Sequence, residues 1–120
     1  CTLTGPWKPS SLLGWDSGPS KYLDAKERGK AAWAPEIVLP GEYRVSFFKL
    51  GRPGNARAAI LTINHAGGQS ERRLELTEGG HEWVDCGVYR FEKGRTGNAV
   101  LTGDGTGYLR ADAVKFEKVK

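Results

Sequence analysis

The most constraining feature of this sequence is the close spacing of its turn-forming residues. Glycine and proline supply 17 and 6 of the 120 residues. They recur along the chain, for example at 40–41, 51–55, 66–68, 79–80 and 103–107, and they break it into segments that show no helical period. Many short strands joined by tight turns are typical of all-β domains. The sequence therefore predicts an all-β fold.

The segments between the turns alternate in hydrophobicity as strands do. Tyr43, Val45 and Phe47 alternate with polar residues, which predicts a strand over 42–48 with one face in the core. Residues 58–65 are apolar on both faces and predict a central strand. Residues 1–30 predict a short strand followed by a long surface loop. Further strands are expected over 30–34, 72–76, 83–91, 98–102 and 108–117. Together these segments predict one domain over residues 1–120, an antiparallel β-sandwich of jelly-roll type with about eight strands.

Charge and hydropathy exclude several classes of protein. The net charge is +4, and residues 1–60 carry the whole excess, with 9 Lys and Arg against 5 Asp and Glu. No basic run exceeds Arg72–Arg73, so a nucleic-acid partner is not expected, whereas an acidic polymer stays open. No apolar stretch reaches transmembrane length and no signal peptide is evident. The absence of methionine predicts a processed protein or a piece of a longer one.

The cysteines and histidines do not predict a metal centre. Cys1, Cys86, His65 and His81 lack the spacing of a zinc site. Cys86 lies in an apolar strand, which favours a buried small hydrophobic residue, and a disulfide to Cys1 is the alternative. Cys1 could also be a lipoprotein cysteine.

The sequence contains none of the common catalytic signatures. G-x-S-x-G, H-E-x-x-H, the P-loop and C-x-x-C are all absent. Asp112 shares strand parity with Val114 and Phe116 and therefore falls on a face predicted to be buried. A buried carboxylate needs hydrogen bonds, a charged partner or a metal ion. We expect hydrogen bonds at Asp112, with structural calcium or catalysis as alternatives and no other cofactor.

Several sequence blocks together resemble a known family. They are AAWAPEI (31–37), LPGEYRVSFF (39–48), Asn55-x-Arg57, INHAGG (63–68), HEWVDCGVYRF (81–91), GNAVLT (97–102) and YLRADAVKF (108–116). The chain resembles, over nearly its whole length, the golvesin C-terminal-like domain, also described as the xanthan lyase carbohydrate-binding-like domain. The resemblance implies a galactose-binding-like jelly roll that occurs as a non-catalytic module appended to secreted bacterial lyases, hydrolases or oxidoreductases. It therefore implies an extracellular, periplasmic or cell-surface location. It also implies core roles for Trp7, Trp33, Tyr43, Trp83, Gly87, Phe91, Asp112 and Phe116.

Binding of a sugar requires an aromatic platform flanked by polar side chains. The candidate platforms are aromatic residues that the predicted core does not use: Trp15, Tyr22, Phe48 and Tyr108. The candidate polar partners lie in the neighbouring loops: Asp16, Lys21, Arg52, Asn55 and Arg57. The basic excess of the first half favours a polysaccharide that carries uronate or other anionic groups.

Three functional hypotheses follow from the sequence. The first is a non-catalytic module that binds polysaccharide and keeps an attached enzyme on its substrate. The second is a structural module that packs on a parent enzyme through an apolar patch of Trp15, Tyr22 and Phe48 and binds no sugar. The third is a small enzyme, which requires paired acids in a cleft or an acid beside His65 or His81.

Overall fold

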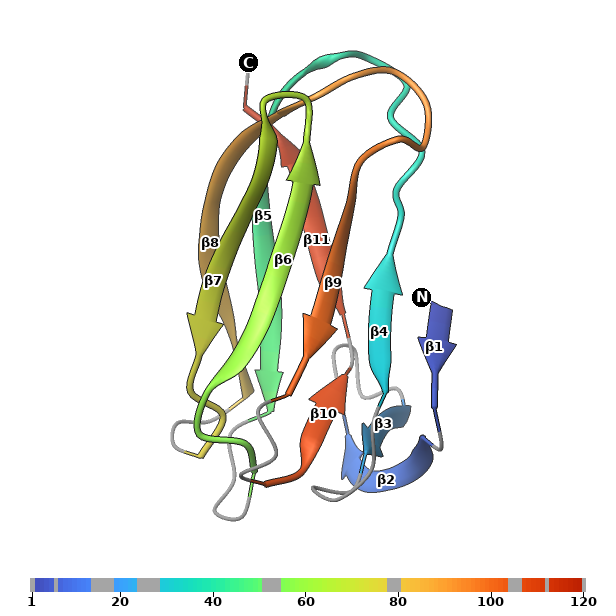
Figure 1. The fold of residues 1–120 in the computed structure, drawn as a ribbon, viewed down its shortest axis with the longest axis vertical. Helices are drawn as coiled ribbons and strands as arrows, with labels where there is room; N and C mark the ends of the chain where they lie inside the picture. The colour runs from blue at the N-terminus through green and yellow to red at the C-terminus, as the bar shows by residue number, and fades with distance from the viewer. Residues whose placement is uncertain are drawn as a thin grey trace.

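All described secondary structure is β-strand (Figure 1). The computed structural model describes residues 2–5, 7–13, 19–23, 29–50, 55–77, 81–103, 107–111 and 113–119. The strands are β1 (Thr2–Thr4), β2 (Lys8–Leu13), β3 (Pro19–Leu23), β4 (Lys30–Trp33), β5 (Gly41–Leu50), β6 (Ala59–His65), β7 (Gly68–Leu74), β8 (His81–Phe91), β9 (Asn98–Thr102), β10 (Leu109–Ala111) and β11 (Val114–Lys118).

The strands form a sandwich with a small third sheet at one end. The large sheet has the order β1-β4-β9-β6-β7, and the sheet β11-β5-β8 lies behind it in Figure 1. The third sheet, β10-β3-β2, lies at the lower end of the view. Every pairing between named strands is antiparallel. The predicted all-β jelly-roll sandwich is confirmed.

The described strands outnumber the predicted eight for two reasons. Residues 8–13 and 19–23, which the sequence predicts as surface loop, form β2 and β3 and pair with each other. The predicted closing strand is divided into β10, which pairs with β3, and β11, which pairs with β5. The third sheet exists because residues 109–111 return to segment 19–23, and local sequence gives no signal for a pairing over that separation.

A bulge in β8 keeps its apolar side chains on the core face. Ser46 pairs with Asp85 and Arg44 pairs with Val88, so two residues of β8 oppose one residue of β5. Gly87 occupies the bulge with φ 108°, which glycine adopts without strain. Asp85 Oδ1 accepts the Gly87 N–H at 2.8 Å. The extra residue resets the alternation, so residues 84, 86, 89 and 91 all contact the core.

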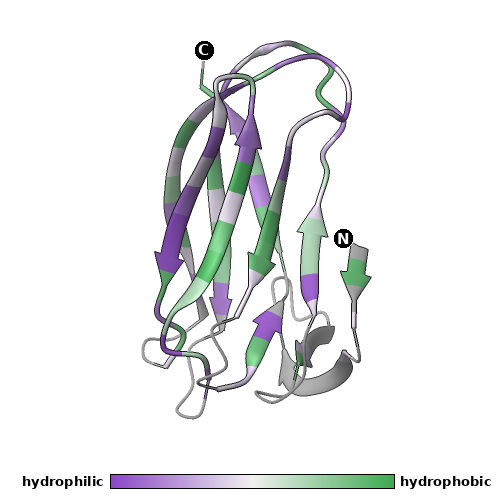
Figure 2. Ribbon diagram, in the orientation of Figure 1, coloured by the Kyte–Doolittle hydropathy of each residue, from purple (hydrophilic) through white to green (hydrophobic). Residues whose placement is uncertain are grey.

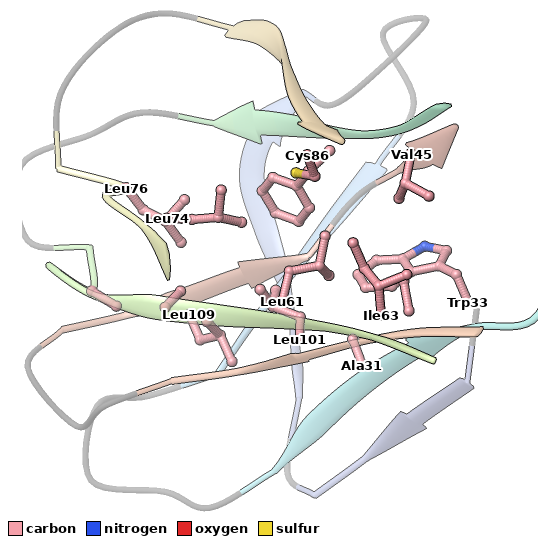
Figure 3. Close-up of a cluster of buried hydrophobic side chains, with 14 of the residues drawn as sticks. Ala31, Trp33, Val45, Leu61, Ile63, Leu74, Leu76, Cys86, Leu101 and Leu109 are labelled. Carbon is pink, nitrogen blue, oxygen red and sulfur yellow. The ribbon is translucent and has the colours of Figure 1, made fainter. Parts of the chain in front are cut away.

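The core lies between the two large sheets (Figure 3). Alternate residues of the central strands are fully buried, as Leu61 and Ile63 of β6 and Leu101 of β9 illustrate. Side chains from the opposite sheet, including Val45 and Cys86, point toward them in Figure 3. The edge strand β7 is predominantly hydrophilic (Figure 2), and charged edges of this kind oppose pairing with other chains.

Two of the expected aromatic placements need correction. Trp83 is not part of the main core cluster, because it lies opposite Phe48 on the outer face of the β11-β5-β8 sheet. Phe48 is only 7% exposed, and its ring meets the Trp83 ring edge-on with centroids 5.1 Å apart. Lys115 Nζ lies 4.4 Å from the Trp83 ring centroid. Phe48 is thus covered by its neighbours and does not present a ring face to solvent.

Candidate functional site

Two tyrosines meet at the end of the sandwich where the third sheet lies. Tyr108 immediately precedes β10, and Tyr22 lies in β3, to which β10 is paired. The ring centroids are 5.6 Å apart with an interplanar angle of 88°. Tyr108 is 39% exposed, and Tyr22 is half-buried. The sequence predicts both residues as sugar platforms, and the pairing of β3 with β10 makes them neighbours.

Arg110 lies against both tyrosine rings. It is the direct cross-strand partner of Tyr22. Its Cζ atom is 5.4 Å from the Tyr22 centroid and 5.7 Å from the Tyr108 centroid. Both distances are within the range of cation–π attraction. The guanidinium therefore contacts two rings from different segments, Tyr22 in β3 and Tyr108 beside β10.

Asn55 connects Arg110 to the interior of the domain. Its side chain is buried, and Oδ1 accepts a hydrogen bond from Arg110 Nε at 2.8 Å. Its Nδ2 donates to the Leu76 carbonyl at 3.0 Å. The Asn55 backbone forms an isolated parallel bridge with Tyr108. We call Tyr22, Asn55, Tyr108 and Arg110 the loop-end cluster.

The loop-end cluster has the chemical groups that sugar recognition requires. Phenol rings offer apolar faces with a hydroxyl at one end, and a guanidinium offers several donors in one plane. Arg57, two residues beyond Asn55, is exposed. The cluster lies at the lower end in Figure 1, away from the segment that joins β4 to β5.

The other predicted site residues have mixed outcomes. Trp15, Arg52 and Asp112 lie outside the described residues, as does Asp16. Phe48 is removed from the exposed candidates by its burial against Trp83. Arg110 is absent from the sequence-based candidates, although it stands two residues after Tyr108 in the YLRADAVKF block. Its spacing from Tyr108 is a usable signal only once β10 is known to pair with β3.

His65 and Tyr89 are held in structural contacts. His65 Nδ1 accepts the Gly67 N–H at 3.2 Å, so the proton is on Nε2, which donates to Ser70 Oγ at 2.9 Å. The His65 ring stacks on Tyr89 at a centroid distance of 4.9 Å. Burial raises the pKa of Tyr89, whose hydroxyl donates to the Cys86 carbonyl at 2.6 Å.

Cys86 is a buried free cysteine, as its apolar strand predicts. Burial raises the pKa of its thiol to about 11. Cys1 lies outside the described residues. Within the described ranges, no group of three or more His, Cys, Asp or Glu side chains is arranged to hold a metal ion. The same part of the chain contains no helical segment with the length and hydrophobicity that a bilayer crossing requires.

Residues 1–118 match the family model of the Golvesin C-terminal domain. The chain belongs to this family. The match extends over almost the whole sequence and confirms the resemblance that the sequence blocks indicate. No curated protein matches the sequence of this golvesin-family domain.

Solved structures share the fold of the golvesin-family domain at low sequence identity. A Paenibacillus xanthan lyase superimposes with a TM-score of 0.87 and 24% identity, over 99% of this chain and 12% of the lyase chain. The module TmCBM61, solved in complex with β-1,4-galactotriose, superimposes with a TM-score of 0.64 and 16% identity, over 98% of this chain and 88% of that one. An exo-β-1,3-galactanase from Phanerochaete chrysosporium gives 0.61 and 15%, over 96% of this chain and 27% of the galactanase. The family domain thus spans a small part of the two enzymes and nearly all of the module.

Proposed function

We propose that this domain is a non-catalytic carbohydrate-binding module and that the loop-end cluster is its sugar site. The observation that carries the proposal is the meeting of Tyr22 and Tyr108 around Arg110 at one end of the sandwich. The fold supports it, because the domain shares its architecture with a module that binds a galactotriose. Enzyme chemistry is not part of the proposal.

Stacking on Tyr108 is the expected main interaction. Its ring is the more exposed of the two, so a pyranose can bury its C–H face against it and lose contact with water. The guanidinium of Arg110 lies 5.7 Å from the centroid of that ring. Its donors and the phenol hydroxyls are groups of the kind that bond vicinal hydroxyls. Affinity at a single small site of this kind is on the order of 0.01 to 1 mM.

The finer parts of the proposal concern the setting of the module. We propose that residues 1–120 form one module of a longer secreted protein, located outside the cytoplasm, in which an attached enzyme gains substrate retention through avidity. The match to 12% of a xanthan lyase chain supports such an arrangement. The excess of basic residues in the first half supports an anionic polysaccharide as the ligand. We propose no cofactor for the module, and structural calcium near Asp112 is the alternative to hydrogen bonds at that carboxylate.

A second candidate function is docking onto a parent enzyme without sugar binding. Phe48 does not belong to the apolar patch first expected for it, because it is only 7% exposed, and Trp15 lies outside the described residues. A different observation favours it: Val38 and Leu39 are 69% and 61% exposed. They lie in the segment between β4 and β5, at the opposite end of the sandwich from the loop-end cluster. The two functions could therefore use separate ends of one domain.

Affinity electrophoresis tests the carbohydrate proposal. The isolated domain is run through gels that contain xanthan, pectic polysaccharides, glycosaminoglycans or neutral galactans. We expect retardation on at least one of them and a loss of about tenfold or more in affinity for Tyr108→Ala, because an aromatic stacking contact is removed. Tyr108→Phe keeps the ring and separates stacking from hydroxyl contacts.

The matched control is Val88→Ala, an exposed side chain on β8 in the other sheet. It should bind as the unmodified domain does. Absence of retardation on every polysaccharide would refute the carbohydrate proposal. Equal affinity of Tyr108→Ala and the unmodified domain would move the sugar site away from the loop-end cluster.

A further inference from the structure

The two ends of the Asn55 side chain contact different parts of the domain. Nδ2 donates to the Leu76 carbonyl, just beyond β7, at 3.0 Å. Oδ1 accepts from Arg110 Nε at 2.8 Å. Asn55 itself is 2% exposed. We propose that the amide nitrogen of Asn55 serves the fold, whereas its oxygen positions Arg110 and thereby sets Tyr22 and Tyr108 for ligand. The part of this inference that concerns ligand rests on the proposed function.

The contact through Nδ2 belongs to a backbone assembly. Leu76 N donates to the Ala56 carbonyl at 3.1 Å, and Ala56 N donates to the Tyr108 carbonyl at 2.8 Å. Residues 55–56 therefore lie between residue 76 and residue 108 and connect them. Leu76 thus bonds to Ala56 through its N–H group, and the Asn55 amide adds a buried hydrogen bond to the Leu76 carbonyl. Removal of that donor leaves a carbonyl without this partner, which destabilises the folded state.

The contact through Oδ1 constrains where the guanidinium lies. A guanidinium is planar, so a hydrogen bond at Nε constrains both its position and the direction of its plane. Arg110 Cζ is within 5.7 Å of the centroids of both rings. A shift of Arg110 therefore changes its distance to Tyr22 and to Tyr108 together. Since Asn55 is buried and bonded to Leu76, its oxygen is a fixed reference point for the long side chain of Arg110.

Two substitutions separate the roles of the two ends. Asn55→Asp keeps an oxygen that accepts from Arg110, in a charge-assisted bond, and replaces the Nδ2 donor by a second acceptor that faces the Leu76 carbonyl. Asn55→Ala removes both contacts. Both variants should therefore unfold at a lower temperature than the unmodified domain. Asn55→Asp should nevertheless restore, relative to Asn55→Ala, the placement of Arg110.

The first measurement uses the full chain without ligand. In NMR spectra the Arg110 Hε and side-chain methylene protons should be shifted upfield by the ring currents of the two tyrosines. We expect Asn55→Asp to retain most of that shift and Asn55→Ala to lose it. Loss of the shift to the same extent in both variants would overturn the inference, as would its full retention in both.

The second measurement uses the polysaccharide that retards the unmodified domain most in affinity gels. We expect Asn55→Ala to lose about tenfold in affinity and Asn55→Asp to recover most of the loss, although both are less stable. Ile63→Val, a core substitution remote from the cluster, controls for lowered stability and should bind normally. Arg110→Lys should behave as Asn55→Ala does, because an ammonium cannot reproduce the planar contact.

The outcomes separate the two proposals. If affinity follows the melting temperature across Asn55→Asp, Asn55→Ala and Ile63→Val, the Oδ1 contact is merely structural and the inference is wrong. If no polysaccharide retards the unmodified domain but the NMR shifts follow the expected pattern, the positioning role stands and the proposed function fails.

Discussion

The buried thiol of Cys86 makes the free energy of unfolding vary with pH in the alkaline range. Cys86 is fully buried, and burial raises the pKa of the thiol from 9.0 to about 11, with the Arg72 charge acting in the opposite direction. The folded chain therefore retains this proton between pH 9 and pH 11, whereas the unfolded chain releases it. Because the native state binds more protons in that window, the free energy of unfolding falls as pH rises through it.

The magnitude follows from the size of the shift. One pKa unit corresponds to about 1.4 kcal/mol, so Cys86 contributes a loss of about 1 kcal/mol at pH 10 that rises toward about 3 kcal/mol above pH 11. Burial also raises the pKa of Tyr89, which adds a loss of the same sign. Below about pH 8 neither residue makes the free energy of unfolding depend on pH, because both groups are then protonated in the folded and the unfolded chain.

Urea unfolding of the unmodified domain and of Cys86→Ala between pH 8 and pH 10.5 isolates the thiol. Cys1 and Tyr89 are present in both proteins, so their ionisation largely cancels in the difference. The unmodified domain should lose about 1 kcal/mol more than Cys86→Ala at pH 10 relative to pH 8. Parallel pH dependences in the two proteins would refute the reasoning. In agreement with the same pKa, thiol reagents should modify native Cys86 slowly at pH 8.

Two further predictions concern the β8 bulge and the ligand. Gly87→Ala should lower the free energy of unfolding by about 1 to 3 kcal/mol, because φ is 108° and the added Cβ would lie 2.7 Å from Tyr89 Oη; an unchanged urea midpoint would contradict the bulge. If the ligand is anionic, an increase of salt from about 0.05 to about 0.5 M should weaken gel retardation on that polysaccharide while binding to a neutral one persists. Equal salt dependence for both would argue against an anionic preference.

The strands with strong alternation are the parts of the fold that the sequence predicts well. Residues 42–48 fall within β5, and residues 98–102 coincide with β9. Their patterns suffice because each strand buries one face in the same core, so the local alternation reports burial directly. Residues 8–13 and 19–23 lack this pattern, and they form strands through pairing with each other and with β10.

The loop-end cluster is only partly visible in the sequence. Three members stand out in the sequence because they are aromatic or polar residues near turns: Tyr22, Asn55 and Tyr108. The structure brings them together. Arg110 does not stand out, because its role depends on the cross-strand partner that β3 supplies. Phe48 is the opposite case: its strand parity indicates exposure, but Trp83 from β8 covers it. Parity gives the face of a sheet on which a residue lies, not what packs over that face.

The sequence by itself determines the class of fold, the main core strands, the buried state of Cys86 and the family. These properties depend on turn chemistry, on period-two alternation and on motifs whose information is local or ordered along the chain. The tertiary structure decides which exposed residues form one site. Arg110 lies against the ring of Tyr22, which precedes it by 88 residues in the sequence. Their meeting depends on the pairing of β10 with β3, which no local pattern encodes, and the buried amide of Asn55 bonds to Arg110 there.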